Sequence, residues 1–403
     1  MSLKGTPNHM KYLNKKRILH CIQEHAPISR AEIAVQTQLS KPTVSALVDE
    51  LIQENWVIVK GPGESSTQGG RRPTPLYFNE KAAYIIGTDI GRSYVKIIIS
   101  DLVGNIIDYN QFPTPPYLLT GILQQISDTV NDMLNKQKIS LSKILGLGAG
   151  VPGITDTQKG LIYESPSLGW KNYDFLKEAK KHFTFPIYVD NDTNVEALGE
   201  QWLGNAKQKK NVLYISIGTG IGSGIIIENQ LYRGYSSSAG ELGYMVTNKE
   251  EIKNHFKPIF NHFGYLESVS GGKSIGIKLT ERIKKNEEHP LFEEANKVDL
   301  TGKQAFSLAR QNDALALSVI NEAAEHWAYS IINAASLLNP EIIILGGNVS
   351  KSADLFLPYI QNVVNNYLPS NVTIMTSHLG NNSGVLGAVS LLLREHDCII
   401  QHK

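Results

Sequence analysis

The 403-residue sequence predicts an α/β protein in two parts, a small N-terminal winged helix-turn-helix followed by a larger body of alternating strands and helices. Three short amphipathic helices and two strand-like segments around a turn rich in Gly and Arg predict the first part. Apolar strands that end in turns containing Asp or Gly recur from residue 84 onward and predict the second part. A chain of this length should form two or three domains.

The N-terminal helices follow from apolar spacing and from capping residues. A first helix is predicted over the apolar residues between positions 12 and 22, and its other face is basic, with Lys11, Lys15, Lys16 and Arg17. Ser29 lies three residues before Glu32, the spacing of a capping box, and predicts the start of a second helix. Ser40 precedes a third helix that has Pro42 in its first turn. The second and third helices together predict a helix-turn-helix.

The third helix is expected to enter the DNA major groove, because the second helix of a helix-turn-helix presents its N-terminal side chains to base edges. The residues expected at the DNA are Arg30, Ser40, Lys41, Pro42, Thr43 and Ser45, and Ala46 can meet a thymine methyl group. The alternative interpretation is a three-helix module that binds another protein.

The two strand-like segments, residues 56–59 and 76–78, predict a wing. At its tip Arg71 and Arg72 can reach phosphates or the minor groove. Residues 1–75 hold ten Lys and Arg against six Asp and Glu, a net charge of +4, whereas the whole chain carries +1. Only the N-terminal part therefore has the charge expected of a DNA-binding domain. A basic linker remains the alternative for this segment.

Composition predicts a cytoplasmic protein. No run of about 18 apolar residues predicts a membrane span, and the N-terminus lacks an apolar secretory core. The two cysteines, Cys21 and Cys398, offer neither a disulfide framework nor a zinc motif.

Several strands of the body end in residues suited to ligand binding, which is where ligands gather in open α/β sheets. The strand at 84–91 ends at Asp89 and Gly91, which can serve a nucleotide's magnesium and phosphate, although this signal is weak alone. The strand at 144–151 runs into a loop at Gly153. The strand at 187–191 delivers Asn191 and Asp192 just before a helix predicted over 195–203.

A further strand, residues 212–217, leads into a glycine-rich loop whose backbone amides are free to meet an anion. The loop residues of interest are Gly218, Thr219, Gly220 and Gly222. A tight hairpin without a ligand is the alternative interpretation. A distal segment, residues 342–350, contains Gly346 and Gly347 in a similar setting.

Together these segments resemble the ROK family, a group of bacterial repressors and sugar kinases with an actin-like, two-lobed kinase fold. The resemblance extends from about residue 12 to 393, and only the repressor branch carries the winged helix-turn-helix. Residues 27–30, 40–45, 69–73 and 231–234 are most similar to xylose repressors, with NagC-type regulators as a related group. The resemblance to the ROK family implies a DNA-binding domain at 1–78 and a small lobe at 79–190 that is completed by a C-terminal helix at 383–403. It also implies a large lobe with the dimer surface at 191–382.

The resemblance also implies a sugar pocket. Its residues would be Gly153, Asn191, Asp192, Glu241, Tyr244 and Glu267, with Asp192 at the position of the kinases' general base. A carboxylate beside an amide can accept from one hydroxyl while the amide binds its neighbour. Trp170, in a nearby loop, either reports closure of this pocket or belongs to the core.

Two departures from the family pattern argue against catalysis. The kinases resemble Asp-Ile-Gly-Gly-Thr at the first phosphate loop, whereas this chain places Arg92 after Gly91 and obstructs the cradle for phosphate. The glycines at 218–222 and 346–347 are retained, but they also hold the sheets together. ATP is therefore not expected as a cofactor, and these loops are interpreted as vestigial.

The second departure is the zinc site. Tyr244 stands at the position of the family's His, and Pro258, Phe260 and Tyr265 stand at the aligned cysteine positions. His255 and His262 lie nearby but lack thiolate partners. We therefore expect no metal, with Phe256, Phe260, Phe263 and Tyr265 packing to hold the loop that bears Glu267.

The sequence thus predicts a repressor of carbohydrate-utilisation genes, a homodimer or tetramer that binds palindromic operator DNA and releases it when a monosaccharide binds. An active sugar kinase that also binds DNA is the first alternative, and a sugar-binding scaffold without a DNA role is the second. The sequence does not specify the sugar or the operator.

Overall fold

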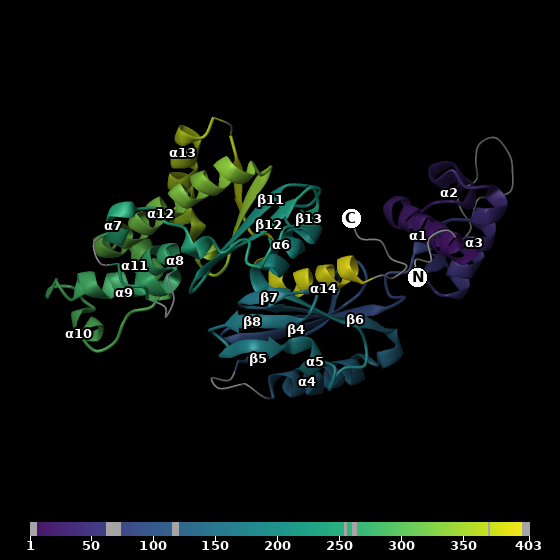
Figure 1. Ribbon diagram of the computed structural model, residues 1–403, viewed down its shortest axis with the longest axis horizontal. Helices are drawn as coiled ribbons and strands as arrows, with labels where there is room; N and C mark the ends of the chain where they lie inside the picture. The colour runs from purple at the N-terminus through teal and green to yellow at the C-terminus, as the bar shows by residue number, and fades with distance from the viewer. Residues whose placement is uncertain are drawn as a thin grey trace.

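The computed structural model describes residues 6–61, 74–114, 121–253, 256–259, 264–369 and 371–396. Figure 1 shows the helical N-terminal domain in purple on the right, a first sheet with its helices in the centre, and a second sheet with a larger set of helices on the left. Within the described ranges no helix is long and apolar enough to cross a membrane.

The N-terminal domain is the predicted winged helix-turn-helix. Its elements are α1 (Pro7–His25), α2 (Arg30–Thr37), α3 (Lys41–Gln53), β1 (Val57–Val59) and β2 (Leu76–Phe78). The predicted capping box is present, since the Ser29 hydroxyl accepts from the Glu32 amide and the Glu32 carboxylate accepts from the Ser29 amide. Ser40 caps α3 in the same way, accepting from the Thr43 amide. The strands β1 and β2 pair antiparallel as the wing.

The basic face predicted for the first helix is wrong in part. Lys15 is only 8% exposed and its ammonium group lies 2.6 Å from Glu54, at the end of α3. Lys11 lies 2.6 Å from Glu50 on α3. These two lysines therefore neutralise acidic groups of the neighbouring helix instead of facing a polyanion. Periodicity alone does not reveal this, because the acidic partners are about 40 residues away.

The segment that joins the wing to the body is hydrogen-bonded to both. The Asn79 amide donates to Trp56 O at 3.0 Å, and its side chain donates to Asn55 O at 2.8 Å. One residue later, Glu80 O accepts from the Leu102 amide at 3.1 Å, in the turn that follows β4. The connection is thus a short strap, residues 79–80, with hydrogen bonds to both parts.

The small lobe is a five-stranded sheet of order β10-β6-β3-β4-β5, with a three-stranded sheet β7-β8-β9 beside it. Its elements are β3 (Tyr84–Ile90), β4 (Tyr94–Ser100), β5 (Ile106–Pro113), α4 (Ile122–Gln137), η1 (Leu141–Lys143), β6 (Ile144–Val151), β7 (Ile154–Asp156), β8 (Leu161–Ser165), β9 (Trp170–Asp174), α5 (Phe175–Ala179) and β10 (Ile187–Asn191). The strands β3, β6 and β10 run parallel, so their carboxyl ends meet at one edge. Trp170 is 2% exposed and stacks on Tyr173, which assigns it to the core of this lobe.

The large lobe is a second five-stranded sheet, of order β13-β12-β11-β14-β15, with helices packed against it. Its strands are β11 (Val212–Ile217), β12 (Ile221–Ile227), β13 (Gln230–Leu231), β14 (Ile342–Gly346) and β15 (Thr373–Thr376). Its helices are η2 (Leu242–Tyr244), α7 (Lys249–Lys253), α8 (Tyr265–Ser270), α9 (Gly272–Ile283), α10 (Phe292–Ala295), α11 (Gly302–Arg310), α12 (Ala314–Leu338), η3 (Val349–Leu355), α13 (Leu357–Tyr367) and η4 (Gly380–Asn382). The long helix α12 supplies much of the core on the helical side.

Two helices, α6 (Asp192–Leu203) and α14 (Ser383–Glu395), pack closely together between the two sheets (Figure 1). Their contact needs glycine, because a Cβ at Gly387 would lie 1.8 Å from Val195 O. Both helices differ from the sequence prediction at one end. The helix α6 begins three residues earlier than predicted because Asn191 caps it, and α14 ends at Glu395 within the predicted span 383–403.

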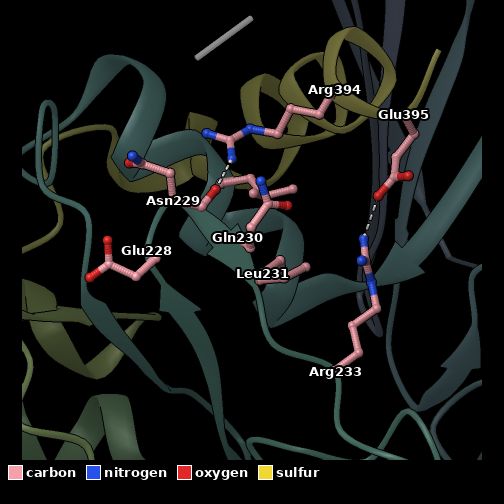
Figure 2. A pocket seen from close by; sticks show the side chains of 8 residues that line it. Glu228, Asn229, Gln230, Leu231, Arg233, Arg394 and Glu395 are labelled. Carbon is pink, nitrogen blue, oxygen red and sulfur yellow. Dashed lines mark hydrogen bonds and ion pairs between the residues drawn. The ribbon is translucent and has the colours of Figure 1, made fainter. Parts of the chain in front are cut away.

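A polar cavity of about 400 Å³ lies beside the C-terminal end of α14 (Figure 2). Arg394 crosses it and donates to Asn229 O at 3.1 Å, and its other terminal nitrogen donates to the Gln201 side chain at 2.8 Å. None of the residues predicted for the sugar pocket lines this cavity.

Candidate functional site

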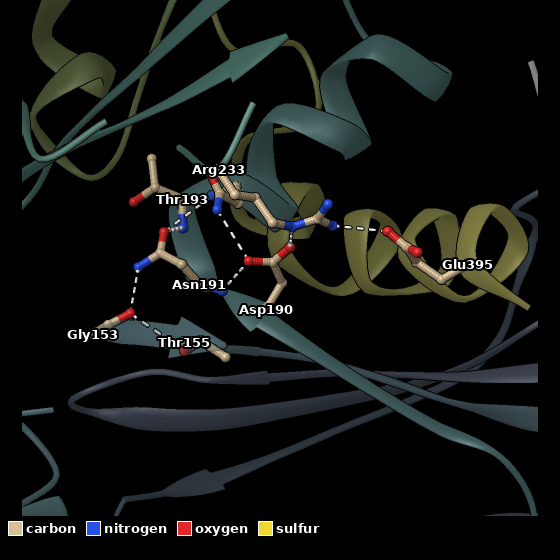
Figure 3. Close-up of polar contacts among 8 residues, drawn as sticks. Gly153, Thr155, Asp190, Asn191, Thr193, Arg233 and Glu395 are labelled. Atoms are coloured by element: carbon tan, nitrogen blue, oxygen red, sulfur yellow. Dashed lines mark hydrogen bonds and ion pairs between the residues drawn. The ribbon is translucent and has the colours of Figure 1, made fainter. Parts of the chain in front are cut away.

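The end of β10 and the start of α6 hold Asn191 and Asp192 in fixed positions. Asn191 accepts from the backbone amides of Thr193 and Asn194, and its amide group donates to Gly153 O at 3.1 Å (Figure 3). Asp192 accepts from the Thr193 amide at 2.9 Å. The structure therefore brings Gly153, Asn191 and Asp192 together, as the sequence predicted. Asn191 already uses its side chain for these protein contacts.

Burial and, second, the negative charge of Asp89 together raise the pKa of Asp192 to about 6. Asp89 is the residue before the last one of β3, which pairs with β6, and its carboxylate lies 3.2 Å from the ammonium group of Lys96. A carboxyl group with a raised pKa near the end of parallel strands is a candidate for exchanging protons or accepting hydrogen bonds from a ligand.

Glu267 enters the site from the large lobe. Its side chain is 9% exposed, and it lies so close to two glycines that a Cβ at Gly220 would be 2.6 Å from its carboxylate and one at Gly264 would be 2.2 Å away. Gly243 also borders it. The second glycine loop and the loop of Glu267 are thus in contact. The strand β12, which follows the second glycine loop, contacts the start of α6, since a Cβ at Gly222 would lie 2.9 Å from the Thr193 hydroxyl.

Tyr244 links the two sides of the site. Burial raises the pKa of its phenol, and the charges of Glu241, Glu267 and Glu164 raise it further, so three carboxylates surround this tyrosine. Glu164 belongs to β8, and its carbonyl oxygen lies against Gly153. Glu164 of the small lobe therefore lies near Tyr244 of the large lobe, and it is a neighbour that the sequence did not point out.

Glu196 is the most consequential residue that the sequence analysis missed. It lies four residues after Asp192 on α6, so both carboxyl groups are on one face of the helix. Its pKa is raised from 4.5 to about 8, mainly by burial and then by the charges of Asp192 and Asp89, with the Ser216 hydroxyl acting in the opposite direction. The spacing would have revealed the pair if the helix had been predicted to begin at Asp192.

We expect the substitution Glu196→Gln to stabilise the fold increasingly as the pH rises. Because the pKa of Glu196 is higher in the folded protein, the native state holds its proton more tightly than the unfolded chain. The wild-type protein should therefore lose stability from about pH 4.5 to pH 8, and a glutamine escapes this loss. Urea unfolding of both proteins at pH 5 and pH 9 tests this, and a difference in unfolding free energy that stays constant with pH would contradict it.

Arg233 fixes the segment that leads to Glu241. Its Nε donates to the buried Asp190 at 2.7 Å, and its terminal nitrogen donates to Glu395 of α14 at 2.9 Å (Figure 3). Asp190 in turn accepts from the backbone amide of Asn191 at 2.7 Å. One side chain therefore connects the end of β10, the large lobe and the last turn of α14.

The three glycine-rich segments differ in what surrounds them. A Cβ at Gly218 would meet nothing within 4 Å, so this loop faces open space. A Cβ at Gly346 would lie 1.8 Å from the Tyr214 hydroxyl, and one at Gly347 would lie 2.4 Å from Ile217 O. The glycines of the distal segment are thus needed for sheet packing, and Thr219 and Gly91 lie in the other two loops as the sequence indicated. Arg92 is exposed next to Gly91.

The loop that carries Glu267 is held in part by the predicted aromatic packing. Tyr265 is fully buried, its ring lies 5.1 Å from that of Phe256, and its hydroxyl donates to Glu251 at 2.7 Å. The ring of His326 also lies near Tyr265, at 6.2 Å between ring centres. Among the described residues no three His, Cys, Asp or Glu side chains are arranged to hold a metal ion. Four residues that the sequence analysis named at or near the family's zinc site lie outside the described residues: His255, Phe260, His262 and Phe263.

The start of α3 presents the predicted DNA-reading residues unevenly. Ser40, Lys41 and Pro42 are exposed, whereas Thr43 and Ser45 are half-buried. The Thr43 hydroxyl is 2.8 Å from that of Ser40. Among the residues that the structure describes, Lys41 forms no ion pair.

Arg30 braces the two helices of the helix-turn-helix. Its guanidinium lies 2.6 Å from Asp49 and donates to Ser45 O at 3.4 Å. Its expected role at the DNA is therefore shared with a structural one. Arg71 and Arg72 lie outside the described residues.

Comparison with known proteins explains this arrangement. The family model "ROK family" matches residues 85–395, and the model "Winged helix-turn-helix DNA-binding" matches residues 13–58. The chain belongs to the ROK family. It is 32% identical over 97% of its length to a xylose repressor of Caldicellulosiruptor bescii, 98% of which is covered.

Two solved ROK structures separate the parts of the chain. A ROK transcriptional regulator, described as a homologue of the E. coli MLC protein, matches 95% of this chain and 96% of its own with a TM-score of 0.79 at 23% identity. A ROK glucokinase of Streptomyces griseus, solved with glucose and AMPPNP, matches 77% of this chain and 99% of its own with a TM-score of 0.64 at 25% identity. The kinase match spans about three quarters of this chain, whereas the regulator match spans nearly all of it.

Proposed function

We propose that the protein is a sugar-responsive transcriptional repressor of carbohydrate-utilisation genes. In this proposal a homodimer binds a palindromic operator through its two α3 helices, and a monosaccharide in the site between the lobes releases the DNA. The observation that carries the proposal is the winged helix-turn-helix joined to a ROK body in one chain that matches a xylose repressor over 97% of its length. A monosaccharide that binds one arrangement of the lobes more tightly supplies the free energy that weakens DNA binding.

The sugar is proposed to lie between Asn191 and Asp192 on one side and Glu241, Tyr244 and Glu267 on the other. Support comes from the carboxylates near Tyr244, because Glu164 belongs to the small lobe whereas Glu241 and Glu267 belong to the large lobe. Xylose is the first candidate because the similar repressors are named for it. We further propose that the protein needs neither zinc nor ATP. Tyr244 in place of the family's histidine and Arg92 in the first phosphate loop support this.

The decisive experiment is a titration of sugar against the protein–DNA complex. A labelled palindromic duplex, selected by the protein from a random-sequence pool, is followed by fluorescence anisotropy while xylose, glucose, N-acetylglucosamine, allose or fructose is added. Release of the duplex by one free sugar is expected. Tight DNA binding that no sugar alters would contradict the proposal, and binding to no duplex would favour a scaffold without a DNA role.

We expect Lys41→Ala to weaken operator binding about 5- to 150-fold, because a side chain that reads a base edge contributes about 1–3 kcal/mol of discrimination. The dependence of affinity on salt should become shallower if Lys41 also meets a phosphate. Lys297→Ala, which removes an exposed lysine of the large lobe, is the matched control. Equal affinities for the two variants would show that α3 does not read the operator.

A sugar kinase that also binds DNA is the second candidate function. The open space before Gly218 and the similarity to a glucokinase solved with AMPPNP favour it. Phosphate transfer from ATP to a hexose, abolished in Asp192→Asn, would establish this activity. No turnover with the same sugars would leave the repressor as the function.

A further inference from the structure

The helix α6 runs from the proposed sugar site toward the opposite end of the small-lobe sheet. Asn191 caps its first turn and Asp192 is its first residue, and both belong to the proposed site. Its last turn, 12 residues along the helix, ends at Leu203. The turn at residues 101–105 joins β4 to β5 at that far end, since Ser100 pairs with Ile85 at the start of β3. The helix therefore connects two places that share no direct contact through the sheet.

The end of α6 lies tightly against this turn. A Cβ at Gly104 would be 2.4 Å from Leu203 Cδ1 and 3.2 Å from the ring of Trp202. Gly104 also has a φ of +93°, a conformation that favours glycine. Because not even a methyl group fits into this contact, a shift of α6 toward the turn displaces the turn and is not absorbed by empty space.

The turn is rigid and is bonded to the strap between the wing and the body. Asp101 is fully buried, and its carboxylate accepts from the Asn105 amide and from the Asn105 side chain, both at 2.9 Å. The Leu102 amide donates to Glu80 O of the strap at 3.1 Å. Leu102 also belongs to the same apolar cluster as Leu76 of the wing strand β2. A displacement of the turn therefore moves the strap and the wing with it.

We propose that Trp202 and Leu203 couple the sugar site to the DNA-binding domain by pressing on Gly104 when a sugar at the start of α6 shifts this helix. The inference rests on the proposed function, because it names how occupancy of the sugar site reaches the wing. Both residues lie at the far end of α6 from the sugar site, so they are positioning residues of the turn. The coupling element is a helix with a tight contact at one end and the ligand at the other.

Gly104→Ala should mimic the sugar signal, because its methyl group pushes the turn and α6 apart. Without sugar, the affinity of the full-length protein for the selected duplex, measured by fluorescence anisotropy, should fall about tenfold or more, within the range of allosteric couplings. Gly169→Ala is the matched control, since Gly169 has a φ of +69° but a Cβ there would meet nothing within 4 Å. It imposes similar backbone strain and should leave operator binding unchanged. Adding Leu203→Ala to Gly104→Ala makes room for the methyl group and should restore binding.

Leu203→Ala alone should have the opposite effect. It should bind the operator like the wild-type protein, but the sugar concentration needed for half release should rise about tenfold or more. The titrant is whichever of xylose, glucose, N-acetylglucosamine, allose and fructose releases the wild-type complex. Affinity for that sugar without DNA, measured by isothermal titration calorimetry, should be unchanged. Leu141→Ala, which truncates an exposed leucine of the small lobe, is the control.

Two outcomes would overturn the proposal. One is an operator affinity of Gly104→Ala equal to that of the wild-type protein, and the other is full release of DNA from Leu203→Ala at the wild-type sugar concentration. Urea unfolding of each variant separates a lost function from a lost fold, and Leu203→Ala carries the test if Gly104→Ala does not fold. Failure of the proposed function looks different, because the wild-type complex would then respond to none of the five sugars.

Discussion

Replacing Arg233 with methionine should lower the free energy of unfolding by about 3–5 kcal/mol, the cost typical of leaving one partner of a buried ion pair without the other. Asp190 is fully buried, and Arg233 supplies its charge partner at 2.7 Å. The remaining contacts of Asp190 come from the Asn191 amide and the Asn194 side chain, which are neutral donors. They cannot compensate for a carboxylate held away from water.

The matched control for Arg233→Met is Glu395→Gln, which removes only the partner at the other end of the guanidinium. Glu395 is exposed, so its contact at 2.9 Å should contribute about 1 kcal/mol or less. Urea unfolding measures both variants. Equal losses of unfolding free energy in the two variants would show that the ion pair with Asp190 contributes no more to stability than the ion pair with Glu395. A second readout is the sugar response, because Asp190 also fixes the amide of Asn191.

Asp192→Asn should abolish the response to sugar while leaving operator binding without sugar unchanged. A carboxylate that accepts from a sugar hydroxyl contributes a charge-assisted hydrogen bond of about 1.5–3 kcal/mol, so sugar affinity should fall about 10- to 150-fold. Asparagine keeps an oxygen that can accept from the Thr193 amide, so the start of α6 should be preserved. Fluorescence anisotropy with operator DNA measures both properties in one titration.

Asp132→Asn, which neutralises an exposed carboxylate on α4, is the control for charge alone. Full release of DNA by the same sugar concentration in Asp192→Asn would place the ligand elsewhere. Loss of operator binding without sugar would instead show that Asp192 supports the fold.

The parts of the fold that depend on local signals were predicted well. Ser29 and Ser40 mark helix starts because a hydroxyl capping a backbone amide is an interaction within four residues. The strands at 187–191 and 212–217 were recognised from short apolar runs. The fold class was predicted from such elements together with the resemblance to the ROK family. The match to the ROK family model and to a solved ROK regulator confirms it.

The contacts that the sequence did not predict join residues far apart along the chain. Lys15 and Glu54 are 39 residues apart, and Arg233 and Asp190 are 43 residues apart, so no periodic pattern reports either pair. Glu196 was missed for a different reason. The predicted helix began too late, which removed the one local relation that connects it to Asp192.

In the proposed dimer, the bonded strap between the wing and the body would limit how the two α3 helices can be spaced. A flexible tether would let each N-terminal domain find its half-site independently, and operators with extra central base pairs would still bind. Asn79 and Glu80 instead connect the wing by hydrogen bonds to the turn after β4, so each N-terminal domain moves with its small lobe. The distance between the two α3 helices of such a dimer would be fixed. One base pair added between the half-sites turns one half-site relative to the other by about a tenth of a helical turn. A rotation of the lobes by a comparable angle would then be enough to detach it.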